Sequence, residues 1–508
     1  MDAQVAAAVI DTPPPFTHAQ IKRVLWGVVV CILLAAVDQT VVVPAVPAIA
    51  RDLNGFNHLS WIVAAYMITS TSAMPIYGKL SDLHGRRALL LPAIVLFVLA
   101  SILCALAQSL LQLIAFRALQ GIGGGGLMAM AQATIADIVA PRERGRYQAY
   151  MATTWATASV SGPILGGWIT DHLSWHFIFW INLPLGVLAY AVSSHVLKML
   201  RVQRRHSRID YAGAALLTGM ITCFLLMMSW GGTEYPWDSV PVIGLGVVAL
   251  LMLAALGWTE RLAIDPLLPP RLFANRVVVC GVVIASMGSA SMLGGTFLLP
   301  LLFQLARGVD ASTSGLLLVP FLAAGPVGAI ISGHVVRRLG RTGGMVLIGL
   351  SSGFAAFVLL GMLAATSGVV VTELLMAAIG ISLGLCMPTS MVIVQNAAER
   401  RDVGSATGAL LFLRSMGGAF GSTLAGSLLA AGFARRLLAG GVTAPIDLGA
   451  VHGQGGALAR LGPAAREVAT AALAGGFRVA FLACAALVGI ALLAAVVMRD
   501  LPLRSGAK

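Results

Sequence analysis

The sequence has few charged side chains for a protein of its length. Aspartate, glutamate, lysine and arginine make up 10% of the 508 residues, whereas 58% of the residues are hydrophobic. An average soluble domain carries about 25% charged residues. Most of this chain therefore cannot face water, and the composition predicts a protein embedded in lipid.

Cysteine is also scarce. Each of the six cysteines falls in a separate apolar run, and none belongs to a C-x-x-C pair. They are residues 31, 104, 223, 280, 386 and 484. This spacing indicates neither a disulfide framework nor a zinc site, so we predict no metal centre.

Lysine is scarcer still, with four in the whole chain. Lys22, Lys79, Lys198 and Lys508 all lie outside the G-x-x-x-x-G-K-S/T pattern that cradles nucleotide phosphates. We therefore expect no nucleotide hydrolysis and no cofactor. Any uphill work must then be driven by an ion gradient, and we predict the proton-motive force.

Acidic residues are outnumbered by basic ones, 20 to 33, which gives a formal net charge of +13. Nucleic-acid-binding proteins gather Lys and Arg into a solvated patch or stripe. Here the basic residues are scattered singly and in twos and threes between apolar runs. We predict no nucleic-acid partner and interpret the positive charge as a signal of membrane topology.

Long apolar runs recur from one end of the chain to the other. A bilayer core about 30 Å thick requires about 20 apolar residues per helix, and fourteen runs meet this length. The predicted spans are 24–48, 59–80, 88–107, 111–137, 147–170, 174–197, 209–230, 239–258, 277–304, 313–336, 343–365, 370–396, 404–432 and 475–498. The predicted fold class is an all-α integral membrane protein with 14 transmembrane helices.

The distribution of positive charge predicts the orientation of these spans. Cytoplasmic loops carry an excess of Lys and Arg, and an even number of spans places both termini on one side. With the termini inside, 24 of the 33 basic residues fall in cytoplasmic segments and seven in external ones. This count assigns Lys79 and Arg478, at the ends of spans, to the adjoining loops, and the remaining two, Arg117 and Arg414, lie deep within spans. Both termini are therefore predicted to be cytoplasmic.

Two pairs of segments are related by one offset of 255 residues. GKLSDLHGRR (78–87) corresponds to GHVVRRLGRT (333–342), and SGPILGG (161–167) corresponds to the run that contains Gly417 and Gly421. The first pair ends the second and the tenth span, so two spans have been inserted between two halves of six. Two parallel six-helix halves with a site at their interface is a recurrent transporter architecture.

The repeat predicts three parts. They are an N-terminal six-helix bundle (1–200), two inserted linker helices (201–270) and a C-terminal six-helix bundle (271–508). The longest hydrophilic interruption, 433–474, is predicted to be an external loop that contains a short interfacial helix near 464–474.

Three charged side chains stand out because they lie well inside predicted spans: Asp38, Arg117 and Arg414. A charge at the centre of a membrane helix costs roughly 2.5 to 3.5 kcal/mol on insertion scales and usually faces the bundle interior. Burial favours the neutral form of the Asp38 carboxyl, whereas a nearby arginine favours the charged form. We predict that Asp38 carries protons and that Arg117 adjusts its protonation. The alternative is a permanent structural pair between Asp38 and either arginine.

A gate is predicted at the cytoplasmic end of the second span. Asp82 and Arg86 are four residues apart and therefore lie on one face of a helical turn, and Gly85 permits a tight turn between them. The predicted gating residues of this segment are Gly78, Asp82, Gly85, Arg86 and Arg87.

Two partners are predicted for this segment. Asp137, at the cytoplasmic end of the fourth span, is placed to pair with Arg86. Asp82 is placed to face the N-terminus of a neighbouring helix near Gly404, because a helix N-terminus attracts negative charge. Such contacts would hold one conformation closed on the inside. The alternative is a positively charged loop with no gating role.

The fifth span contains Gly162, Pro163, Gly166 and Gly167. Proline removes a hydrogen bond from a helix, and glycines allow close approach of a second helix. We predict a kinked, closely packed helix that acts as a hinge or a proton-tight seam. The glycines of RALQGIGGGG (117–126) are interpreted as positions where another helix approaches closely, because a dinucleotide-binding glycine motif requires a preceding strand.

Polar and aromatic side chains within spans are candidates for a substrate cavity, although most are equally expected as ordinary packing. They are Gln39, Gln120, Trp155, Gln304, Gln395, Asn396 and Arg414. The spans hold few acids besides Asp38. This composition argues against a preference for dications and favours large amphipathic or lipophilic molecules.

Together these motifs resemble the major facilitator superfamily, and the two inserted spans resemble its 14-helix drug:proton antiporter branch. GKLSDLHGRR resembles the second-span loop motif, and RALQGIGGG resembles the fourth-span motif, whose arginine, here Arg117, the family implicates in proton coupling. SGPILGG resembles the antiporter motif of the fifth span, and VDQTVVVPAVP (37–47) resembles the first-span motif, with Asp38 and Thr40 retained. SWHFIFWINLPLG (174–186) resembles the sixth span of the branch.

The resemblance implies a proton-coupled multidrug antiporter of the bacterial inner membrane that exports drugs, dyes or biocides by alternating access, and not an enzyme. Its expected partners are the lipid bilayer, protons and a small-molecule substrate. We expect a monomer that works alone or with a periplasmic adaptor and an outer-membrane channel. The alternatives are a dedicated exporter of one endogenous metabolite or lipid, a channel or scramblase, and a transport-dead membrane sensor or scaffold.

Overall fold

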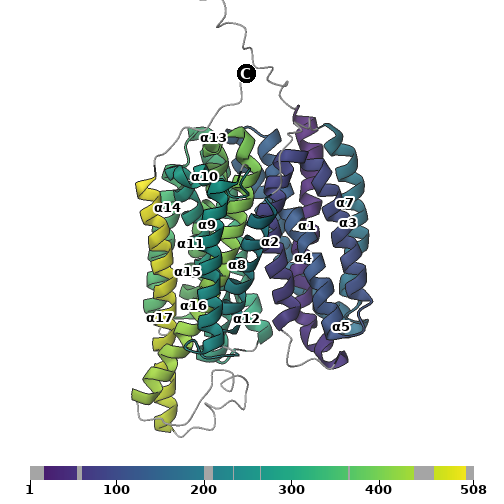
Figure 1. The fold of residues 1–508 in the computed structure, drawn as a ribbon. Helices are drawn as coiled ribbons and strands as arrows, with labels where there is room; N and C mark the ends of the chain where they lie inside the picture. Colours follow the sequence, from purple (N-terminus) through teal and green to yellow (C-terminus); the bar gives the residue numbers. More distant parts are fainter. Residues whose placement is uncertain are drawn as a thin grey trace, which may run out of the picture.

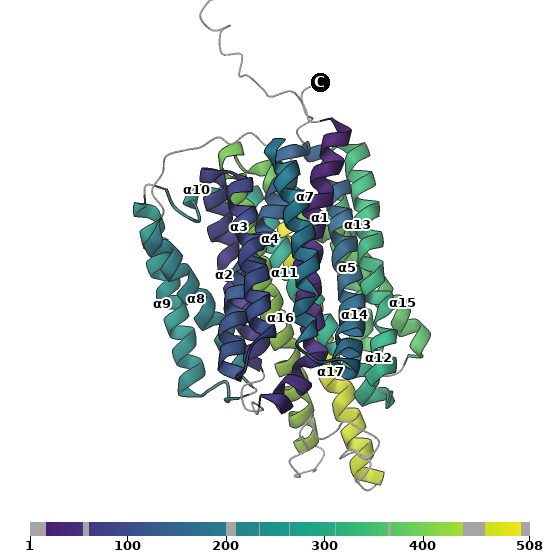
Figure 2. The same cartoon turned by 90° about the vertical axis from the view of Figure 1, so that its right-hand side faces the viewer.

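The computed structural model describes residues 17–53, 60–199, 210–439 and 463–498, apart from 233, 264, 310 and 364–366. Within these ranges the chain forms helices that pack side by side along one common direction (Figure 1 and Figure 2). The only β-type pairing among the described residues is an isolated bridge between Gly231 and Tyr235.

The helices form two groups with a pair between them in sequence. The N-terminal group contains α1 (His18–Asp52), α2 (Ser60–His84), α3 (Arg86–Ala105), α4 (Leu110–Ile138), α5 (Pro141–His172), α6 (Phe177–Trp180) and α7 (Asn182–Val196). The pair consists of α8 (Tyr211–Trp230) and α9 (Val240–Leu262). The C-terminal group contains α10 (Pro270–Ala274), α11 (Arg276–Leu301), α12 (Ala311–Leu317), α13 (Val319–Leu339), α14 (Gly343–Leu363), α15 (Val369–Ala397), α16 (Val403–Ala439) and α17 (Pro463–Val497).

Twelve helical segments among the described residues are long and apolar enough to cross a bilayer. They confirm the predicted all-helical membrane architecture. The second and fifth predicted spans correspond to α2 and α5, which have 25 and 32 residues and fall outside this set of twelve. Both helices are less apolar than the others, because α2 carries a run of hydroxyl side chains (69–72) and α5 begins with the charged stretch 142–146.

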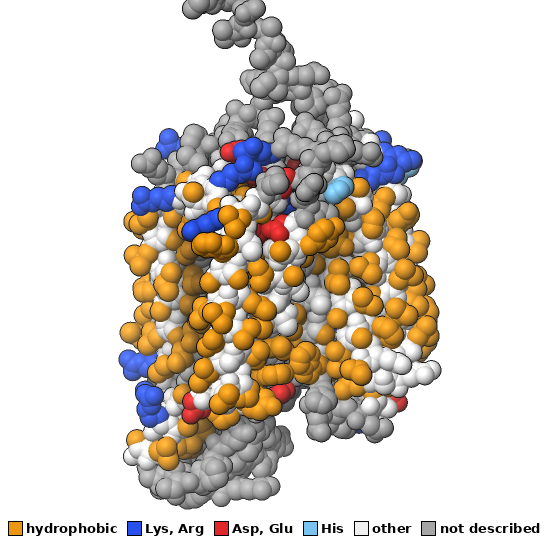
Figure 3. All heavy atoms as spheres, viewed as in Figure 1, with side chains coloured by type: hydrophobic (Ala, Val, Ile, Leu, Met, Phe, Trp, Pro, Cys, Tyr) orange, Lys and Arg blue, Asp and Glu red, His pale blue; other side chains and the backbone are white. Residues whose placement is uncertain are grey.

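The two ends of the described chain lie at the same end of the bundle. Figure 1 shows the start of α1 and the end of α17 at this end, which we call the terminal face. We call the other end the opposite face. Figure 3 shows a broad band of hydrophobic side chains around the middle of the bundle and Lys and Arg side chains gathered near the terminal face. This distribution is the one expected for a bundle whose middle lies in lipid.

The repeated glycines make equivalent contacts in the two groups. At Gly162 and Gly166 of α5, an added Cβ atom would collide with α1. At Gly417 and Gly421 of α16, an added Cβ atom would collide with α11. The offset of 255 residues therefore corresponds to a repeated helix pair, in which glycine lets two helices approach closely.

The other repeated glycines join the two groups. Gly78 of α2 packs against Gly404 of α16, and Gly333 of α13 packs against Gly145 of α5. Each of these contacts lies toward the terminal face, where α2 and α13 end and α5 and α16 begin. The two groups therefore touch through two related glycine contacts at this end of the bundle.

The pair α8 and α9 packs on the side of the bundle (Figure 2). The two helices contact each other, and α8 contacts α2 and α16, one helix from each group. Trp61 of α2 meets Trp230 of α8 edge to face at 6.0 Å between ring centroids. Most of α9 exposes large apolar side chains, among them Leu250, Leu251 and Leu253, as expected for a helix that faces lipid.

The predicted loop 433–474 is too long. Helix α16 continues to Ala439 and α17 begins at Pro463, so both helices extend into this segment, and residues 440–462 lie outside the described residues. The interfacial helix predicted near 464–474 is instead the first part of α17. Alanine, leucine and arginine have high helix propensity, which explains why both helices continue past their apolar runs.

Candidate functional site

The centre of the candidate site is a buried ion pair between α1 and α4. Asp38 and Arg117 have 0% and 1% of their surface exposed. The Arg117 Nη1 atom lies 2.7 Å from Asp38 Oδ2. The sequence left open which arginine pairs with Asp38, and the structure places Arg117 there, whereas Arg414 lies on α16 in the other group.

Two amide side chains complete the surroundings of Asp38. Gln120 Nε2 and Asn182 Nδ2 each donate a hydrogen bond to Asp38 Oδ1 at 2.7 Å. Gln120 also accepts a hydrogen bond from Arg117 at 2.7 Å, and Asn182 donates a second one to Ser101 Oγ at 2.9 Å. The Asp38 carboxylate therefore accepts hydrogen bonds from three side chains on two other helices, α4 and α7.

Arg117 is held by further contacts on the second helix. Its guanidinium carbon lies 4.3 Å from the ring centroid of Tyr66, and its Nε atom donates to the Ile62 carbonyl at 3.4 Å. Because α1, α2, α4 and α7 all contribute to this cluster, a rearrangement of the N-terminal group would change the contacts of Asp38. This coupling of one carboxyl to several helices is what a conformation-dependent proton site requires.

Sequence reasoning missed Asn182, Ser101 and Tyr66. Asn182 was visible as an amide within the apolar stretch FIFWINLPLG. Nothing in the sequence pairs that position with Asp38, because 144 residues separate them. Ser101 and Tyr66 are of types that occur in many membrane helices, so neither gives a signal by itself.

The predicted gate contacts are present at the terminal face. Asp82 Oδ1 and Oδ2 accept hydrogen bonds from the backbone N–H groups of Gly404 at 3.0 Å and Ser405 at 2.8 Å. These N–H groups belong to the first turn of α16, so the carboxylate of α2 lies at the N-terminus of a helix from the other group. The predicted position of Asp82 is confirmed.

Arg86 connects Asp82 to α4. Its guanidinium lies 2.9 Å from Asp82 Oδ1 and 2.8 Å from Asp137 Oδ2, which confirms the predicted pair with Asp137. Gly85 has φ +87°, a conformation that favours glycine, and Gly340, its counterpart in the repeat, has φ +68°. The structure does not include Arg87 in this network, because its Nε atom is buried without a hydrogen-bond partner.

Further polar contacts join the groups near the same face. Gln395 of α15 donates a hydrogen bond to the carbonyl of Gln132 on α4 at 3.5 Å. Glu143 of α5 and Arg337 of α13 lie 3.8 Å apart. Together with the gate and the glycine contacts, these interactions close the terminal face between the two groups.

The fifth predicted span behaves only in part as expected. Helix α5 runs unbroken from Pro141 to His172 through Pro163, whose side chain is exposed. Gly162 and Gly166 lie against α1, where Thr40 Oγ1 also donates to the Ala158 carbonyl at 3.0 Å. A Cβ atom added at Gly167 would meet no other atom within 4 Å. The predicted role of Gly167 in close packing is therefore wrong.

The predicted cavity residues do not form one cluster. Gln120 is fully buried beside Asp38, and Gln304 donates to Ser314 near the opposite face at 2.8 Å. Gln395 and Asn396 are buried near the terminal end of α15. Gln39, Trp155 and Arg414 are half-buried, on α1, α5 and α16 respectively. Polarity within an apolar run identifies interior positions but does not tell which of them share a space.

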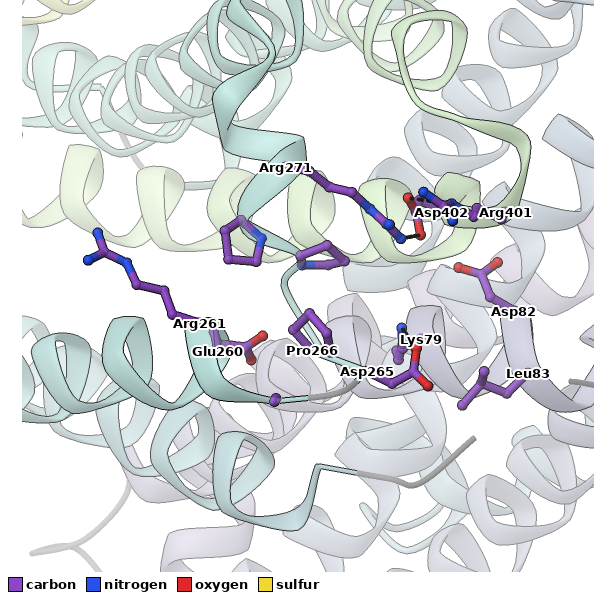
Figure 4. A pocket seen from close by; sticks show the side chains of 13 residues that line it. Lys79, Asp82, Leu83, Glu260, Arg261, Asp265, Pro266, Arg271, Arg401 and Asp402 are labelled. Carbon is purple, nitrogen blue, oxygen red and sulfur yellow. Dashed lines mark hydrogen bonds and ion pairs between the residues drawn. The ribbon is translucent and has the colours of Figure 1, made fainter. Parts of the chain in front are cut away.

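A cavity of about 540 Å³ adjoins the gate at the terminal face. Figure 4 shows side chains from the end of α2, from the end of α9 and the segment after it, and from the start of the α16 region. Lys79 lies 3.7 Å from Asp265, and Arg271 lies 2.8 Å from Asp402. The segment after α9 therefore bonds to the N-terminal group through Asp265, and α10 bonds to the start of the α16 region through Arg271. Sequence reasoning did not identify this cavity.

Neither a metal site nor a disulfide is visible in the part of the chain that the structure describes. No three His, Cys, Asp or Glu side chains gather there in a way that could hold a metal ion. The six cysteines are free thiols, five of them buried.

Comparison with known proteins agrees with this geometry. Residues 28–422 match the model of the Major Facilitator Superfamily. This chain belongs to that superfamily. It is therefore a membrane transporter.

Relatives of this transporter include bacterial drug transporters. It is 36% identical over 417 residues to the multidrug transporter protein MdtP of Bacillus subtilis (strain 168), which covers 81% of this chain and 76% of the relative. It is 33% identical over 425 residues to multidrug resistance protein 3 of the same organism, covering 83% and 82%. The solved structure of the human organic anion transporter MFSD10 has the same fold, with a TM-score of 0.63 at 15% identity over 95% of this chain and all of that one.

Proposed function

We propose that this transporter exports amphipathic or lipophilic small molecules, such as drugs, dyes and biocides, in exchange for protons. The observation that carries the proposal is the buried pair of Asp38 and Arg117. A carboxyl inside a bilayer is costly, so its presence there usually marks a functional site, and a carboxyl can exchange a proton. The names of the relatives support drug efflux as the transported class.

We further propose that all fourteen predicted spans cross the membrane. Helices α2 and α5 are as long as their neighbours and contact them along the bundle. An even number of crossings agrees with the position of the start of α1 and the end of α17 at the same face. The excess of Lys and Arg assigns the terminal face to the cytoplasm of a bacterial inner membrane.

In this proposal the transporter has the three parts 1–200, 201–270 and 271–508. The glycine contacts hold the two bundles together at the cytoplasmic side, so the described conformation is closed there. Opening would break the contacts of Asp82 with α16 and separate α5 from α13. The inserted helices accompany this motion, because α8 touches both bundles. We propose a monomer as the transporting unit, alone or with a periplasmic adaptor and an outer-membrane channel.

The proposed cycle alternates two states of Asp38. In the described conformation its carboxylate is matched by Arg117, Gln120 and Asn182. A proton that enters from outside neutralises Asp38 and weakens its hold on Arg117, and the substrate leaves. The inward-open form returns the proton to the cytoplasm and takes up substrate. Coupling requires that proton and substrate favour different states.

The proton-motive force is large enough for this exchange. One proton that crosses about 100 mV supplies roughly 2.3 kcal/mol, and a pH difference of one unit adds about 1.4 kcal/mol. Since about 1.4 kcal/mol corresponds to a tenfold concentration ratio, one proton can sustain a gradient of several hundredfold for a neutral substrate.

Efflux of a fluorescent dye from loaded cells tests the proposal. We expect efflux to stop when a protonophore collapses the proton gradient. Efflux that continues unchanged would identify a channel or scramblase instead. A protein that binds dyes in detergent but moves none, with or without a gradient, would be a sensor.

A further inference from the structure

Arg414 is an arginine inside the bundle without a counter-ion. It lies eleven residues into α16, roughly 16 Å from the terminal end of that helix, and thus near mid-depth. Among the described residues no carboxylate forms an ion pair with it, whereas Arg117, buried in the N-terminal group, is matched by Asp38. Arg117 and Arg414 therefore differ: the charge of Arg117 is neutralised by the protein and that of Arg414 is not.

The exposed part of Arg414 faces the interior of the bundle. Positions seven residues apart on a helix lie on nearly the same face. Seven residues before Arg414, Thr407 accepts a hydrogen bond from Gln395 of α15. Seven residues after it, Gly421 packs against Ala290 of α11. This face of α16 is covered by protein on both sides of Arg414, so the half-buried guanidinium reaches a space between helices and not the lipid.

Two neighbouring helices, α15 and α11, place polar atoms without hydrogen-bond partners beside this face of α16. Gln395 is 3% exposed, and its Oε1 atom is buried with no hydrogen-bond partner. Ser286 of α11 is 8% exposed, its Oγ atom also lacks a partner, and its backbone packs against Gly417, one turn from Arg414. Buried polar atoms are normally paired, so their presence on both sides of an unmatched cation indicates a place where a polar ligand group binds.

We propose that Arg414 binds the anionic group of the substrate, and that the transported molecules include amphipathic organic acids. A guanidinium matches a carboxylate, sulfonate or phosphate with two parallel hydrogen bonds. The ligand supplies the negative charge that the protein lacks at this position, and its apolar body occupies the space between the two groups. This inference rests on the proposed function, because it names a substrate class for the proposed exporter.

The charge of the substrate determines how strongly the membrane potential drives its export. Export of a monovalent anion in exchange for one proton moves two positive charges inward in total, whereas export of a neutral molecule moves one. The membrane potential therefore contributes twice as much to the export of an organic acid. Acid export responds more steeply to membrane potential than the export of its neutral ester.

A matched pair of probes tests the proposal by binding. We choose 11-(dansylamino)undecanoic acid and its methyl ester, which share an apolar body and differ in charge. Binding is measured by dansyl fluorescence with the whole protein in nanodiscs of phosphatidylcholine. We expect Arg414→Gln to weaken binding of the acid by about tenfold to a hundredfold and to leave binding of the ester unchanged, whereas Arg414→Lys retains part of the acid binding.

Controls separate this result from misfolding and from the proposed function. Arg435→Gln removes one exposed arginine from the same helix and should leave both probes unaffected. Equal loss of acid and ester, or no loss of either, overturns the proposal. So does displacement of the acid by phosphatidylglycerol, since the anion would then be a lipid. Charge-selective binding without proton-driven efflux supports the Arg414 site and refutes the exporter.

Discussion

Both oxygens of the Asp38 carboxylate accept hydrogen bonds from buried side chains of the protein. Arg117 binds one oxygen, and Gln120 and Asn182 bind the other. Hydrogen bonds from charged or amide donors stabilise the ionised form of a carboxyl. If Asp38 is the proton-carrying group that we propose, each of the three donors is expected to affect the pH dependence of transport.

Replacing Asn182 by alanine removes one donor to the Asp38 carboxylate. The hydrogen-bond network around this carboxylate is then incomplete, so we expect the pH profile of transport to shift. The measurement is the rate of dye efflux as a function of external pH. Gln108→Ala, at an exposed amide near the start of α4, should leave the profile unchanged. A lower rate with no shift would show that Asn182 has only a structural role.

At the scale of single residues, the sequence was informative where charge and helix position coincide. Asp38 and Arg117 stand out because ionisable residues are rare in apolar runs, and Asp82 and Arg86 because a turn at Gly85 places them together. Asn182 could not be assigned, since an amide in a span has many possible partners. The distribution of Gln304 and Gln395 over both ends of the bundle also depends on packing that one sequence does not specify.

At the scale of helices, glycine position controls the packing of α5 on α1. The face that carries Gly162 and Gly166 lies against α1, whereas Gly167 points to open space. All three residues are glycines, so each of them could allow another helix to approach, and the sequence alone does not distinguish them. Only the rotation of α5 about its axis, which packing determines, shows which of them is required.

Replacing Gly166 by alanine should disturb the α1–α5 contact, because the new Cβ atom would collide with the carbonyl of Val41. Overpacking of this kind costs about 1 to 3 kcal/mol, so we expect a lower thermal unfolding temperature and reduced efflux. Gly167→Ala is the matched control on the same helix and should behave as the wild type. Equal behaviour of the two variants would contradict this account of the interface.

Helix ends were predicted less well than helix existence. The apolar runs located the spans, because lipid requires them. They did not locate the ends of α16 and α17, because a helix can continue into water when its residues favour it. Composition explains why α2 and α5 are less apolar: α2 carries the hydroxyl run 69–72 in the bundle interior, and α5 begins with the charged stretch 142–146.

At the scale of the whole molecule, the terminal face is closed by contacts that belong to a repeated pattern. Gly78 with Gly404 and Gly333 with Gly145 occupy related positions in the two groups. The offset of 255 residues predicted the repeat of the glycines. It did not predict that Gly78 and Gly333 contact the opposite group, since an offset relates segments without saying where each one packs.

Replacing Asp82 by asparagine should weaken the closed state, because the carboxylate that accepts from Gly404 and Ser405 and pairs with Arg86 is lost. We expect the two groups to separate more often at the terminal face. The measurement is the distance between spin labels at Arg146 of α5 and His334 of α13, which are both exposed beside the second glycine contact. A larger population of long distances is expected.

These labels lie on the α5–α13 contact and not on the gate itself, so they report motion of whole groups. Asp171→Asn, at an exposed acid of α5 near the opposite face, should give the wild-type distribution. An unchanged distribution in Asp82→Asn would show that the gate contacts do not hold the two groups together.

The central claim is that Asp38 carries the proton that drives export. The most direct test is substrate-dependent proton movement in proteoliposomes that contain the Asp38→Asn variant, with Asp52→Asn at the exposed end of the same helix as the control. The account predicts that proton movement is abolished in Asp38→Asn and retained in Asp52→Asn, with both proteins folded. Normal proton movement in Asp38→Asn would contradict it.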